Sequence, residues 1–301
     1  MGGYDFGSNG PFWKGISMLG GFRPDSSGST FYLDGNNGST SFNGKSWSRP
    51  FKTWAQMVVA SNADIGRGSD RWARRNTVYV AADDLVESIT AFPEKTDVIG
   101  VGSVNGLKHA QIRGTHVPVA GFGCRIFNMN FAPSTAGTMM LLTNACWGTE
   151  FHNCTFFYDY GATAAVKAID TTGTTYLKII GCTFSGAFSG DVIDIGAGDM
   201  DGFEFRNNMI LGGANDGIVF TGDGTLSGGK YGIIDNNIIK CVTETINDGT
   251  NTSCLITNNK CITAAAHDDA ESITTTMAAN NIVVDGSGVA YTIPRLLGDD
   301  T

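Results

Sequence analysis

The sequence predicts an all-β protein whose strands are wound into a coil that repeats along the chain. The first observation is a six-residue pattern, apolar–polar–Asn–Asn–variable–apolar, found as "FRNNMI" at 205–210, "IDNNII" at 234–239 and "ITNNKC" at 256–261. The second is that the intervening segments alternate apolar and polar residues and are rich in β-branched side chains. The third is a content of 41 glycines against 7 prolines among 301 residues, without the three-residue period of collagen.

The repeat excludes other repeating architectures. Copies aligned on the third position of the pattern are separated by 25, 28, 26, 29, 22 and 22 residues, which is too short for a propeller blade. The aligned residues are Asn128, Asn153, Gly181, Asn207, Asn236, Asn258 and Asn280. A weaker copy, "VIGVGS", has Gly100 in register. Helical and leucine-rich repeats need spacings that are absent here, so a parallel β-helix of about eight turns remains.

The repeated asparagines are expected to be structural. Successive turns of such a coil lie ~4.8 Å apart, so equivalent side chains stack. Asparagine tolerates a left-handed backbone, and its amide can bond to the amides above and below it. We expect one ladder from the fourth positions and a neighbouring column from the third: Asn208, Asn237, Asn259 and Asn281 beside Asn207, Asn236, Asn258 and Asn280. Sugar or metal binding is the alternative, but near-equivalent copies do not supply the different residue types that a site needs.

The segment 29–61 predicts how the coil begins. A first strand, "TFYLD" at 30–34, is followed by a glycine-rich turn and by a helix from about Lys52 to Ala60. The first turn of a coil has open backbone groups and an exposed apolar end, and a short helix near 52–60 is suited to cover them. We expect residues 29–301 to form a single domain.

The segment "FYLDGNNGSTSFNGKSWSRPFKTWAQMV" at 31–58 resembles the opening of pectate-lyase-like right-handed parallel β-helix proteins. In that family a strand, a loop rich in Asp, Asn and Gly, the sequence Pro-Phe-Lys-Thr and a capping helix precede the coil. With the repeats, the resemblance covers roughly residues 29–293. The members that this chain is most similar to are virion proteins of tailed bacteriophages. The resemblance implies a right-handed coil, a homotrimer packed about an axis, and a short particle-binding segment before the coil.

Residues 1–28 match such a segment. They form a glycine-rich stretch without clear periodicity, and aromatic residues dominate protein interfaces. The candidate anchoring residues are Tyr4, Phe6, Phe12, Trp13 and Phe22. The alternative is that this arm packs along the protein's own helix.

Composition argues against several partners. A net charge of −9, from 20 basic and 29 acidic residues, disfavours a nucleic-acid surface. No run reaches the length of a membrane span and no signal peptide is seen, so synthesis in the host cytoplasm is expected. The seven cysteines lack CxxC spacing, which predicts small buried side chains in a reducing compartment. No cofactor or metal is expected.

Polysaccharide cleavage is the competing hypothesis. Glycoside hydrolysis needs two carboxylates on either side of the scissile bond. The acidic stretch supplies Asp191, Asp194, Asp199, Asp201 and Asp216 as candidates. Related hydrolases carry Asn-Thr-Asp, Asp-Asp and Gly-His-Gly on successive turns, but Gly-His-Gly does not occur here. Related lyases use carboxylates for calcium with a basic residue, and only Lys178 and Arg206 are close in sequence, so solvated turn residues are favoured.

The sequence therefore predicts a bacteriophage virion protein. We expect a trimeric β-helix on the particle surface, as a capsid decoration or a spike, anchored through residues 1–28 to capsid or tail proteins. Decoration of the head is favoured because a longer β-helix and a separate trimerising domain, usual in spikes, are not seen. The alternatives are a polysaccharide lyase or glycoside hydrolase using the 191–216 region, and a non-catalytic adhesin that binds host surface polysaccharide on the same flank.

Overall fold

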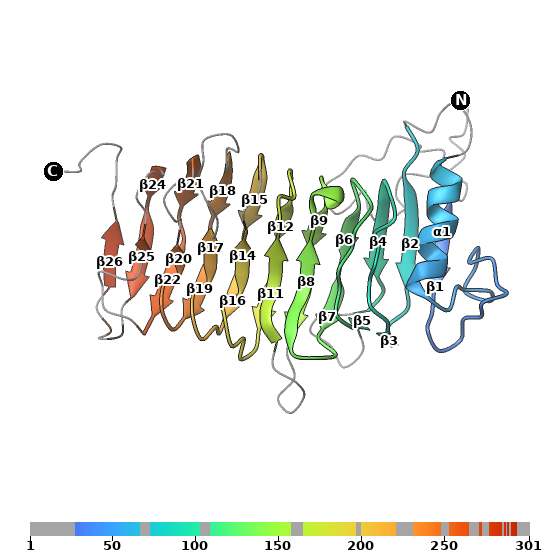
Figure 1. The fold of residues 1–301 in the computed structure, drawn as a ribbon, viewed down its shortest axis with the longest axis horizontal. Coiled ribbons are helices and arrows are strands. Elements are labelled where there is room, and N and C mark those ends of the chain that lie inside the picture. The colour runs from blue at the N-terminus through green and yellow to red at the C-terminus, as the bar shows by residue number, and fades with distance from the viewer. Residues whose placement is uncertain are drawn as a thin grey trace, which may run out of the picture.

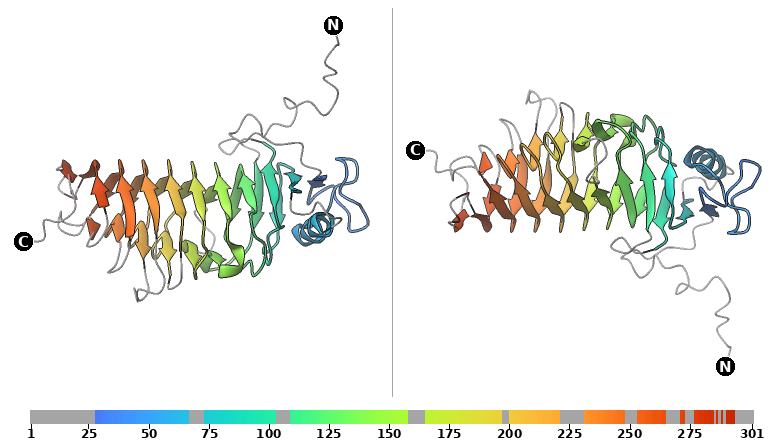
Figure 2. Two further views of the ribbon diagram at one scale, coloured as in Figure 1. Left: turned by 90° about the horizontal axis from the view of Figure 1, so that it is seen from above. Right: turned by 90° about the horizontal axis from the view of Figure 1, so that it is seen from below.

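The chain forms a parallel β-helix, in which successive coils stack along the long axis of the molecule (Figures 1 and 2). The computed structural model describes residues 28–66, 73–102, 109–157, 165–196, 200–220, 231–247, 253–264, 271–272, 277–284, 286, 288 and 290–293. The predicted all-β coil of parallel strands is confirmed. The candidate anchoring residues Tyr4, Phe6, Phe12, Trp13 and Phe22 lie outside the described residues, and so does Asp199.

The strands belong to three sheets that run along the coil axis, two of ten strands each and a shorter third of six strands. Sheet 1 contains, in order, β1 (Thr30–Leu33), β2 (Asn76–Val80), β4 (Thr96–Gly100), β6 (Arg125–Phe127), β9 (Glu150–His152), β12 (Lys178–Ile180), β15 (Phe203–Arg206), β18 (Tyr231–Asp235), β21 (Ser253–Thr257) and β24 (Met277–Ala279). Sheet 2 contains β3 (Asp84–Val86), β5 (Ala110–Arg113), β7 (Met129–Ala132), β10 (Thr155–Phe157), β13 (Thr183–Ser185), β16 (Met209–Leu211), β19 (Ile238–Cys241), β22 (Lys260–Thr263), β25 (Asn281–Val284) and β26 (Ala290–Ile293). Sheet 3 contains β8 (Gly137–Leu142), β11 (Ala165–Thr171), β14 (Ile193–Ile195), β17 (Ile218–Phe220), β20 (Ile246–Asn247) and β23 (Glu271–Ser272).

Strand pairing follows the coil. Every named pair of strands is parallel except β25 with β26, which is antiparallel. Among the described residues, six coils carry a strand in all three sheets, while sheets 1 and 2 each hold ten strands. The sequence predicted about eight turns, a number between these two.

The core is a set of apolar rows, one on the inner face of each sheet. In sheet 1 the inward row is fully buried and consists of Val78, Val98, Ile126, Phe151, Ile179, Phe205, Ile234 and Ile256. In sheet 2 the ring of Phe156 stacks on Phe131 and Phe184, with centroid separations of 5.0 and 4.7 Å. Each row exists only because the neighbouring coil supplies the next member, so the coils are stable as an array. All seven cysteines are free and buried, as the sequence predicted.

A helix, α1 (Trp54–Ile65), covers the first coils (Figure 1). The predicted bounds of Lys52 to Ala60 were wrong at both ends. The helix starts later because Thr53 is the N-cap and forms a capping box with Gln56. It continues to Ile65 because its buried face extends through the last turn.

The carboxylate of Glu87 stabilises the start of this helix. It accepts hydrogen bonds from the backbone N–H of Trp54, at 2.6 Å, and of Ala55, at 3.0 Å. A negative charge is favourable there because the first N–H groups of a helix have no partner within it. Among the described residues no helix is long and apolar enough to cross a membrane.

One histidine lies inside the coil. The His116 side chain is fully buried, packs edge-on against Phe131 and accepts a hydrogen bond at Nδ1 from the backbone N–H of Ile89, at 3.1 Å. Its Nε2 has no hydrogen-bond partner among the described residues. Burial lowers the pKa of His116 to about 4, so the folded protein holds the ring neutral.

We predict that His116 makes the protein less stable in acid. The unfolded chain takes up a proton on this ring near pH 6.5, whereas the folded chain does so only near pH 4. The stabilisation is therefore complete above pH 6.5 and is lost as the pH falls toward 4, by about 3 kcal/mol. The difference in unfolding free energy between pH 7 and pH 4.5 should shrink in His116→Gln and shrink less in His109→Gln, which replaces a partly exposed histidine bonded to the uncharged side chains of Gln111 and Asn130. Equal pH dependence in all three proteins would contradict this assignment.

Candidate functional site

The third positions of the repeat share one backbone conformation. The φ angles are 54° at Asn128, 51° at Asn153, 66° at Gly181, 58° at Asn207, 54° at Asn236, 58° at Asn258 and 59° at Asn280. Only glycine adopts this left-handed region freely, and asparagine is among the few other residues that tolerate it. The turn between sheets 1 and 2 therefore restricts this position to asparagine or glycine. Between neighbouring copies, Asn236 Nδ2 donates to Asn207 Oδ1 at 2.7 Å, whereas Asn258 Nδ2 donates to Asp235 at 2.8 Å.

The fourth positions are buried and bonded to one another. Asn208, Asn237, Asn259 and Asn281 form what we call the asparagine column. In each step, as from Asn237 to Asn259, the backbone N–H and Nδ2 both donate to the next Oδ1, at 2.9 Å. Nδ2 of Asn237 also donates to the carbonyl of Phe205, at 3.0 Å. The side chains thus connect every coil from β15 to β25 through buried hydrogen bonds.

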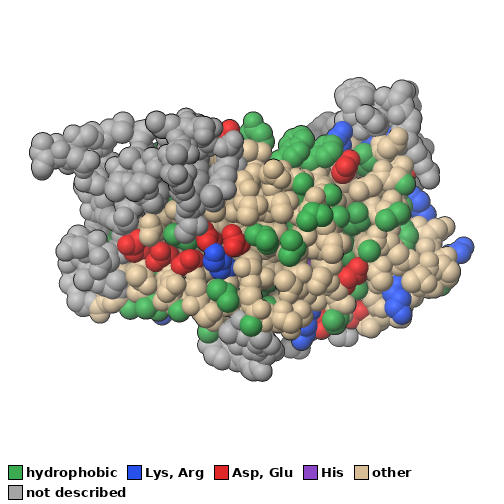
Figure 3. Space-filling view, viewed as in Figure 1, with side chains coloured by type: hydrophobic (Ala, Val, Ile, Leu, Met, Phe, Trp, Pro, Cys, Tyr) green, Lys and Arg blue, Asp and Glu red, His purple; other side chains and the backbone are tan. Residues whose placement is uncertain are grey.

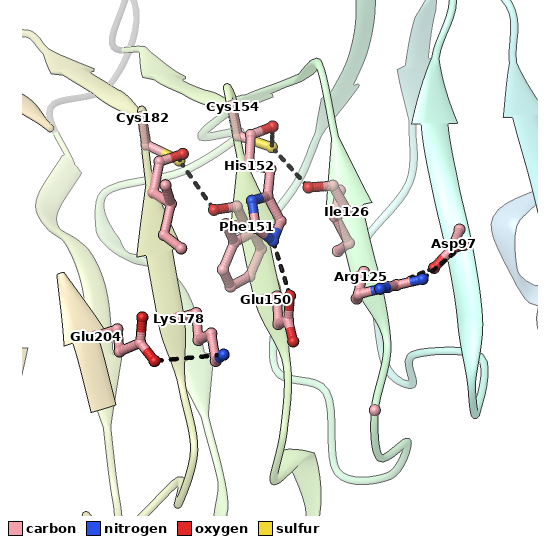
Figure 4. A network of polar contacts seen from close by, with 12 residues as sticks. Asp97, Arg125, Ile126, Glu150, Phe151, His152, Cys154, Lys178, Cys182 and Glu204 are labelled. Atoms are coloured by element: carbon pink, nitrogen blue, oxygen red, sulfur yellow. Dashed lines mark hydrogen bonds and ion pairs between the residues drawn. The ribbon is translucent and has the colours of Figure 1, made fainter. Parts of the chain in front are cut away.

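Cysteines continue this column toward the N-terminus. The backbone N–H of Cys182 donates to Asn208 Oδ1 at 2.9 Å. The thiols of Cys154 and Cys182 lie 3.5 Å from the carbonyl oxygens of Ile126 and Phe151 (Figure 4). Two of the cysteines therefore occupy the same structural position as the asparagines.

The structure separates the predicted catalytic carboxylates. Asp194 lies on β14, on the outer face of sheet 3. Asp191 and Asp216 lie in the turns that precede β14 and β17, where Asp191 Oδ1 accepts a hydrogen bond from the backbone of Asp216 at 3.3 Å. Asp201 lies in the turn before β15, where its carbonyl accepts a hydrogen bond from the backbone of Tyr176. Asp201 therefore lies beside sheet 1, apart from the other three carboxylates.

A basic residue that the sequence did not indicate lies beside Asp194. Lys167 on β11 pairs with Asp194 and, at 3.3 Å, with Asp170. Figure 3 shows acidic side chains gathered around a basic one on the face that carries β11, β14 and β17. Lys178 and Arg206, the two basic residues that are close in sequence to the acidic stretch, both lie in sheet 1, whereas Lys167 reaches Asp194 in sheet 3. The register of β11 against β8 shifts between Ala165 and Lys167, and Lys167 lies one coil before Asp194.

The protonation of this cluster favours an ion pair over proton transfer. Burial lowers the pKa of Lys167, but hydrogen bonding to Asp194 and the two carboxylate charges raise it more, so the net shift is upward. Burial, together with the charge of Asp194, raises the pKa of Asp170 despite the attraction of Lys167. An ammonium with a raised pKa is a poor general base at neutral pH.

Asp216 connects coils in a similar way. Its Oδ1 accepts a hydrogen bond from the backbone of Glu244 at 3.0 Å, and its Oδ2 accepts one from Asn247 Nδ2 at 3.3 Å. Burial raises the pKa of Asp216. Within the described part of the chain, no three His, Cys, Asp or Glu side chains are placed to hold a metal ion.

A groove of about 550 Å³ runs along the turns that follow β13, β16 and β19. Its lining combines apolar side chains and glycines with Lys240 as the one charged residue. None of Asp191, Asp194, Asp201 and Asp216 lines this groove. The groove and the four candidate catalytic carboxylates are therefore separate features of the surface.

A row of alternating charges crosses the outer face of sheet 1 (Figure 4). The charged row consists of Asp97, Arg125, Glu150, Lys178 and Glu204, one from each of β4, β6, β9, β12 and β15. Opposite charges side by side on neighbouring strands stabilise the pairing and its register. The signal was in the sequence, since these residues stand directly before successive copies of the six-residue pattern.

Asp97 is the buried end of the charged row. Its fully buried carboxylate accepts hydrogen bonds from Arg125 Nε and Nη2, at 2.7 and 3.0 Å, and from Arg75 Nη1, at 2.9 Å. Burial lowers the pKa of Arg75, and the nearby Arg125 adds to this. Burial also lowers the pKa of Arg125, but its two hydrogen bonds to Asp97 make the net shift upward. Arg125 donates two hydrogen bonds to Asp97 and Arg75 donates one, so Arg125 is the stronger partner of this carboxylate.

Farther along the row the pairs are more exposed. Glu150 accepts a hydrogen bond from His152 Nε2 at 2.8 Å, and Lys178 lies 3.4 Å from Glu204. Burial raises the pKa of Glu150, but His152, Lys178 and Arg125 lower it more, so the net shift is downward. Glu150 is thus held ionised by its neighbours.

Comparison with known proteins identifies the fold. No family model matches the sequence, and no curated protein matches it. The structure is similar to the pectate lyase Pel9A, with a TM-score of 0.53 and 12% sequence identity over 86% of this chain and 76% of that one. A rhamnogalacturonan lyase matches with a TM-score of 0.47 and 10% identity, over 84% and 87% of the two chains. The Dettilon tailspike protein matches with a TM-score of 0.39 and 12% identity, over 77% and 59%.

We predict that the asparagine column is a main source of stability. Asn237→Ala removes four hydrogen bonds and leaves buried groups of Asn208 and Phe205 without partners. At roughly 1–3 kcal/mol for each unsatisfied group, the free energy of unfolding should fall by about 3 kcal/mol or more. Asn236→Gly is the matched control, because glycine keeps the left-handed backbone at an exposed position, and it should change stability by less than about 0.5 kcal/mol. The free energy of unfolding is measured by chemical denaturation. A similar decrease in the two variants would contradict a particular contribution of the asparagine column to stability.

Proposed function

We propose that the chain is a structural protein displayed on a bacteriophage particle, as a homotrimeric β-helix anchored by residues 1–28. The proposal starts from the parallel β-helix fold, because a likeness at 12% sequence identity shows nothing beyond the fold. The observation that carries this proposal is that acidic side chains on the outside of the coil are bonded to neighbouring coils. Asp97, Asp194 and Asp216 all hold an adjacent turn.

A role in display also agrees with the shape of the molecule. The coils stack in one direction into a rod with α1 at its N-terminal end (Figure 2). Flat sheets form the sides of the rod, and a β-helix with buried rows and a bonded column is suited to a rigid surface projection.

The outer face of sheet 2 offers a surface for a second copy. Exposed Met209 and Ile282 and half-buried Ile238 lie in one row across β16, β25 and β19, with Lys260 of β22 between Ile238 and Ile282. Ile262 is exposed in the next outward row, beside Lys240. Exposed apolar residues on adjacent strands are costly in water and are characteristic of contact surfaces. Packing three rods about one axis would cover this face in each of them, because cyclic symmetry repeats the same contact.

Glycan cleavage remains the second candidate function. The observation in its favour is the pair Asp170 and Asp194, which are directly opposite each other on β11 and β14 with Lys167 between them. Two carboxylates at such close range are a known arrangement for glycoside hydrolysis. Against it, both carboxylates are engaged by an ammonium that stays protonated, and the nearby groove has no carboxylate in its lining. We therefore rank it below the structural role.

We predict that residues 1–28 are needed for attachment and not for folding. Deleting them should abolish incorporation into particles of the parent phage, while light scattering still reports three chains of 31.8 kDa less the deleted arm. A second variant keeps the full length of the arm but replaces five residues by serine: Tyr4, Phe6, Phe12, Trp13 and Phe22. This variant should also fail to attach, which would show that the aromatic side chains and not the length of the arm are needed.

Three different results would contradict three different parts of the proposal. Attachment by the truncated protein would contradict the anchoring role of the arm. A monomeric mass for the intact protein would contradict the homotrimer. Cleavage of host polysaccharide by the intact protein, lost in Asp194→Asn, would establish the second candidate instead.

A further inference from the structure

The proposed homotrimer needs two different contact surfaces on each copy. A surface that packs against itself is used up by two chains, whereas three chains around one axis meet through two different surfaces. The apolar face of sheet 2 supplies one of these surfaces. With the rods side by side along the axis, the second surface lies on the same coils, because rotation about the axis keeps each coil at its height.

Sheet 1 has an apolar surface on these coils. The charged row ends at Glu204 on β15, and the next two positions of the same outward row are Ile233 on β18 and Leu255 on β21. Ile233 is half-buried and Leu255 is 38% exposed. A row of alternating charges thus becomes apolar toward the C-terminal end of the rod.

Sheet 2 changes in the same part of the rod (Figure 1). Its outward row is polar at Asn130, Thr155 and Thr183 on β7, β10 and β13. The row then continues on β16, β19, β22 and β25 as Met209, Ile238, Lys260 and Ile282. The change to apolar residues begins on β16 in sheet 2 and on β18 in sheet 1, which belong to successive coils. One contact that covers both sheets explains why the two rows change together.

Among the described residues, sheet 3 offers no comparable surface on these coils. Its outward row runs from Asp170 through Asp194 to Val219. Asp194 and Val219 are only 4% and 5% exposed in the single chain. Side chains that their own chain already covers leave little area for a partner, so sheet 1 is the better second surface.

The charges on sheets 1 and 2 are complementary. Lys240 and Lys260 are exposed on sheet 2, and neither forms an ion pair with another described residue. On sheet 1, Asp235 shares its coil with Lys240, and Glu204 lies one coil earlier, with Arg206 within 4.0 Å of both carboxylates. Two copies of sheet 2 in contact would bring lysines together, whereas sheet 1 presents two carboxylates and one guanidinium to them. The charges therefore favour contact of sheet 1 with sheet 2.

We propose that the edge between sheets 1 and 2 points to the three-fold axis from β15 to β25, so that sheet 1 of each copy packs against sheet 2 of the next. The inference rests on the proposed function, because it requires the homotrimer. The edge itself carries the exposed third-position asparagines of the repeat: Asn207, Asn236, Asn258 and Asn280. Equivalent amides of three copies face one another at the axis, where they bond to each other or to water.

The experiment cross-links the full chain through one cysteine on each face. Leu255 of sheet 1 and Ile262 of sheet 2 lie on the same coil, and both are 38% exposed. With a short bis-maleimide reagent, the double variant Leu255→Cys/Ile262→Cys should give covalent species of two and three chains and none larger. Neither single variant should cross-link, because each cysteine then meets a face without one. The intact protein is the blank, since its seven native thiols are buried.

The matched control moves one cysteine to another edge of the rod. Thr243 is exposed in the turn that follows β19, between sheets 2 and 3, so Leu255→Cys/Thr243→Cys should not cross-link. A second measurement follows the mass of the oligomer on dilution. Leu255→Lys should raise the concentration at which the trimer dissociates about tenfold or more, because the contact then buries a charge. Val59→Lys, at a residue 71% exposed on α1, should leave that concentration unchanged.

The failures of this inference and of the proposed function differ. Cross-linking of Ile262→Cys alone would show that two copies of sheet 2 meet and would overturn the inference. An intact protein that is a trimer by light scattering, with a double variant that does not cross-link, would place the contact elsewhere and leave the proposed function standing. Cross-linked species of four or more chains would indicate an open assembly and contradict the three-fold axis. A monomeric intact protein would overturn both the homotrimer and this inference.

Discussion

Every coil of this protein depends on the coils beside it, because one turn alone can neither bury its apolar side chains nor satisfy its backbone. A register shift of one residue would turn each inward row outward, so the stacking has to be specified at several points. The asparagine column specifies it in the turn between sheets 1 and 2, through buried bonds from each amide to the next. Cys154 and Cys182 extend the same role toward the N-terminus with weaker donors. The aromatic stack of Phe131, Phe156 and Phe184 specifies it within the core.

The same requirement explains the charged groups on the outside. Strands that meet in parallel bring equivalent residues of successive coils side by side, so like charges would repel and alternating charges attract. The charged row follows this rule from Asp97 to Glu204, and Lys167 separates the two carboxylates of sheet 3 in the same manner. A carboxylate used in this way is already bonded, which is the physical reason for ranking a structural role above catalysis.

The sequence was informative where one residue type is required at a regular position. The left-handed turn accepts only a few residues, so its asparagines and glycines repeated visibly and gave the coil and its approximate period. It was less informative where the partner comes from another coil. Lys167 is 27 residues from Asp194 and lies on the preceding coil, so proximity along the chain pointed to Lys178 and Arg206 instead. The capping helix was predicted, but its ends depend on the Thr53 cap and on burial against β1 and β2, which a hydrophobic pattern does not define.

The central claim is that the polar side chains on the outside of the coil hold neighbouring coils together. A double-mutant cycle on Asp97 and Arg125, measured by chemical denaturation, tests it most directly. Because Asp97→Ala leaves two half-buried guanidinium groups without their anion, the account predicts a loss of about 3–5 kcal/mol in unfolding free energy and a coupling energy above about 1 kcal/mol. A loss no larger than that of Asp84→Ala, which breaks the exposed pair with Arg113, together with a coupling energy near zero, would contradict it.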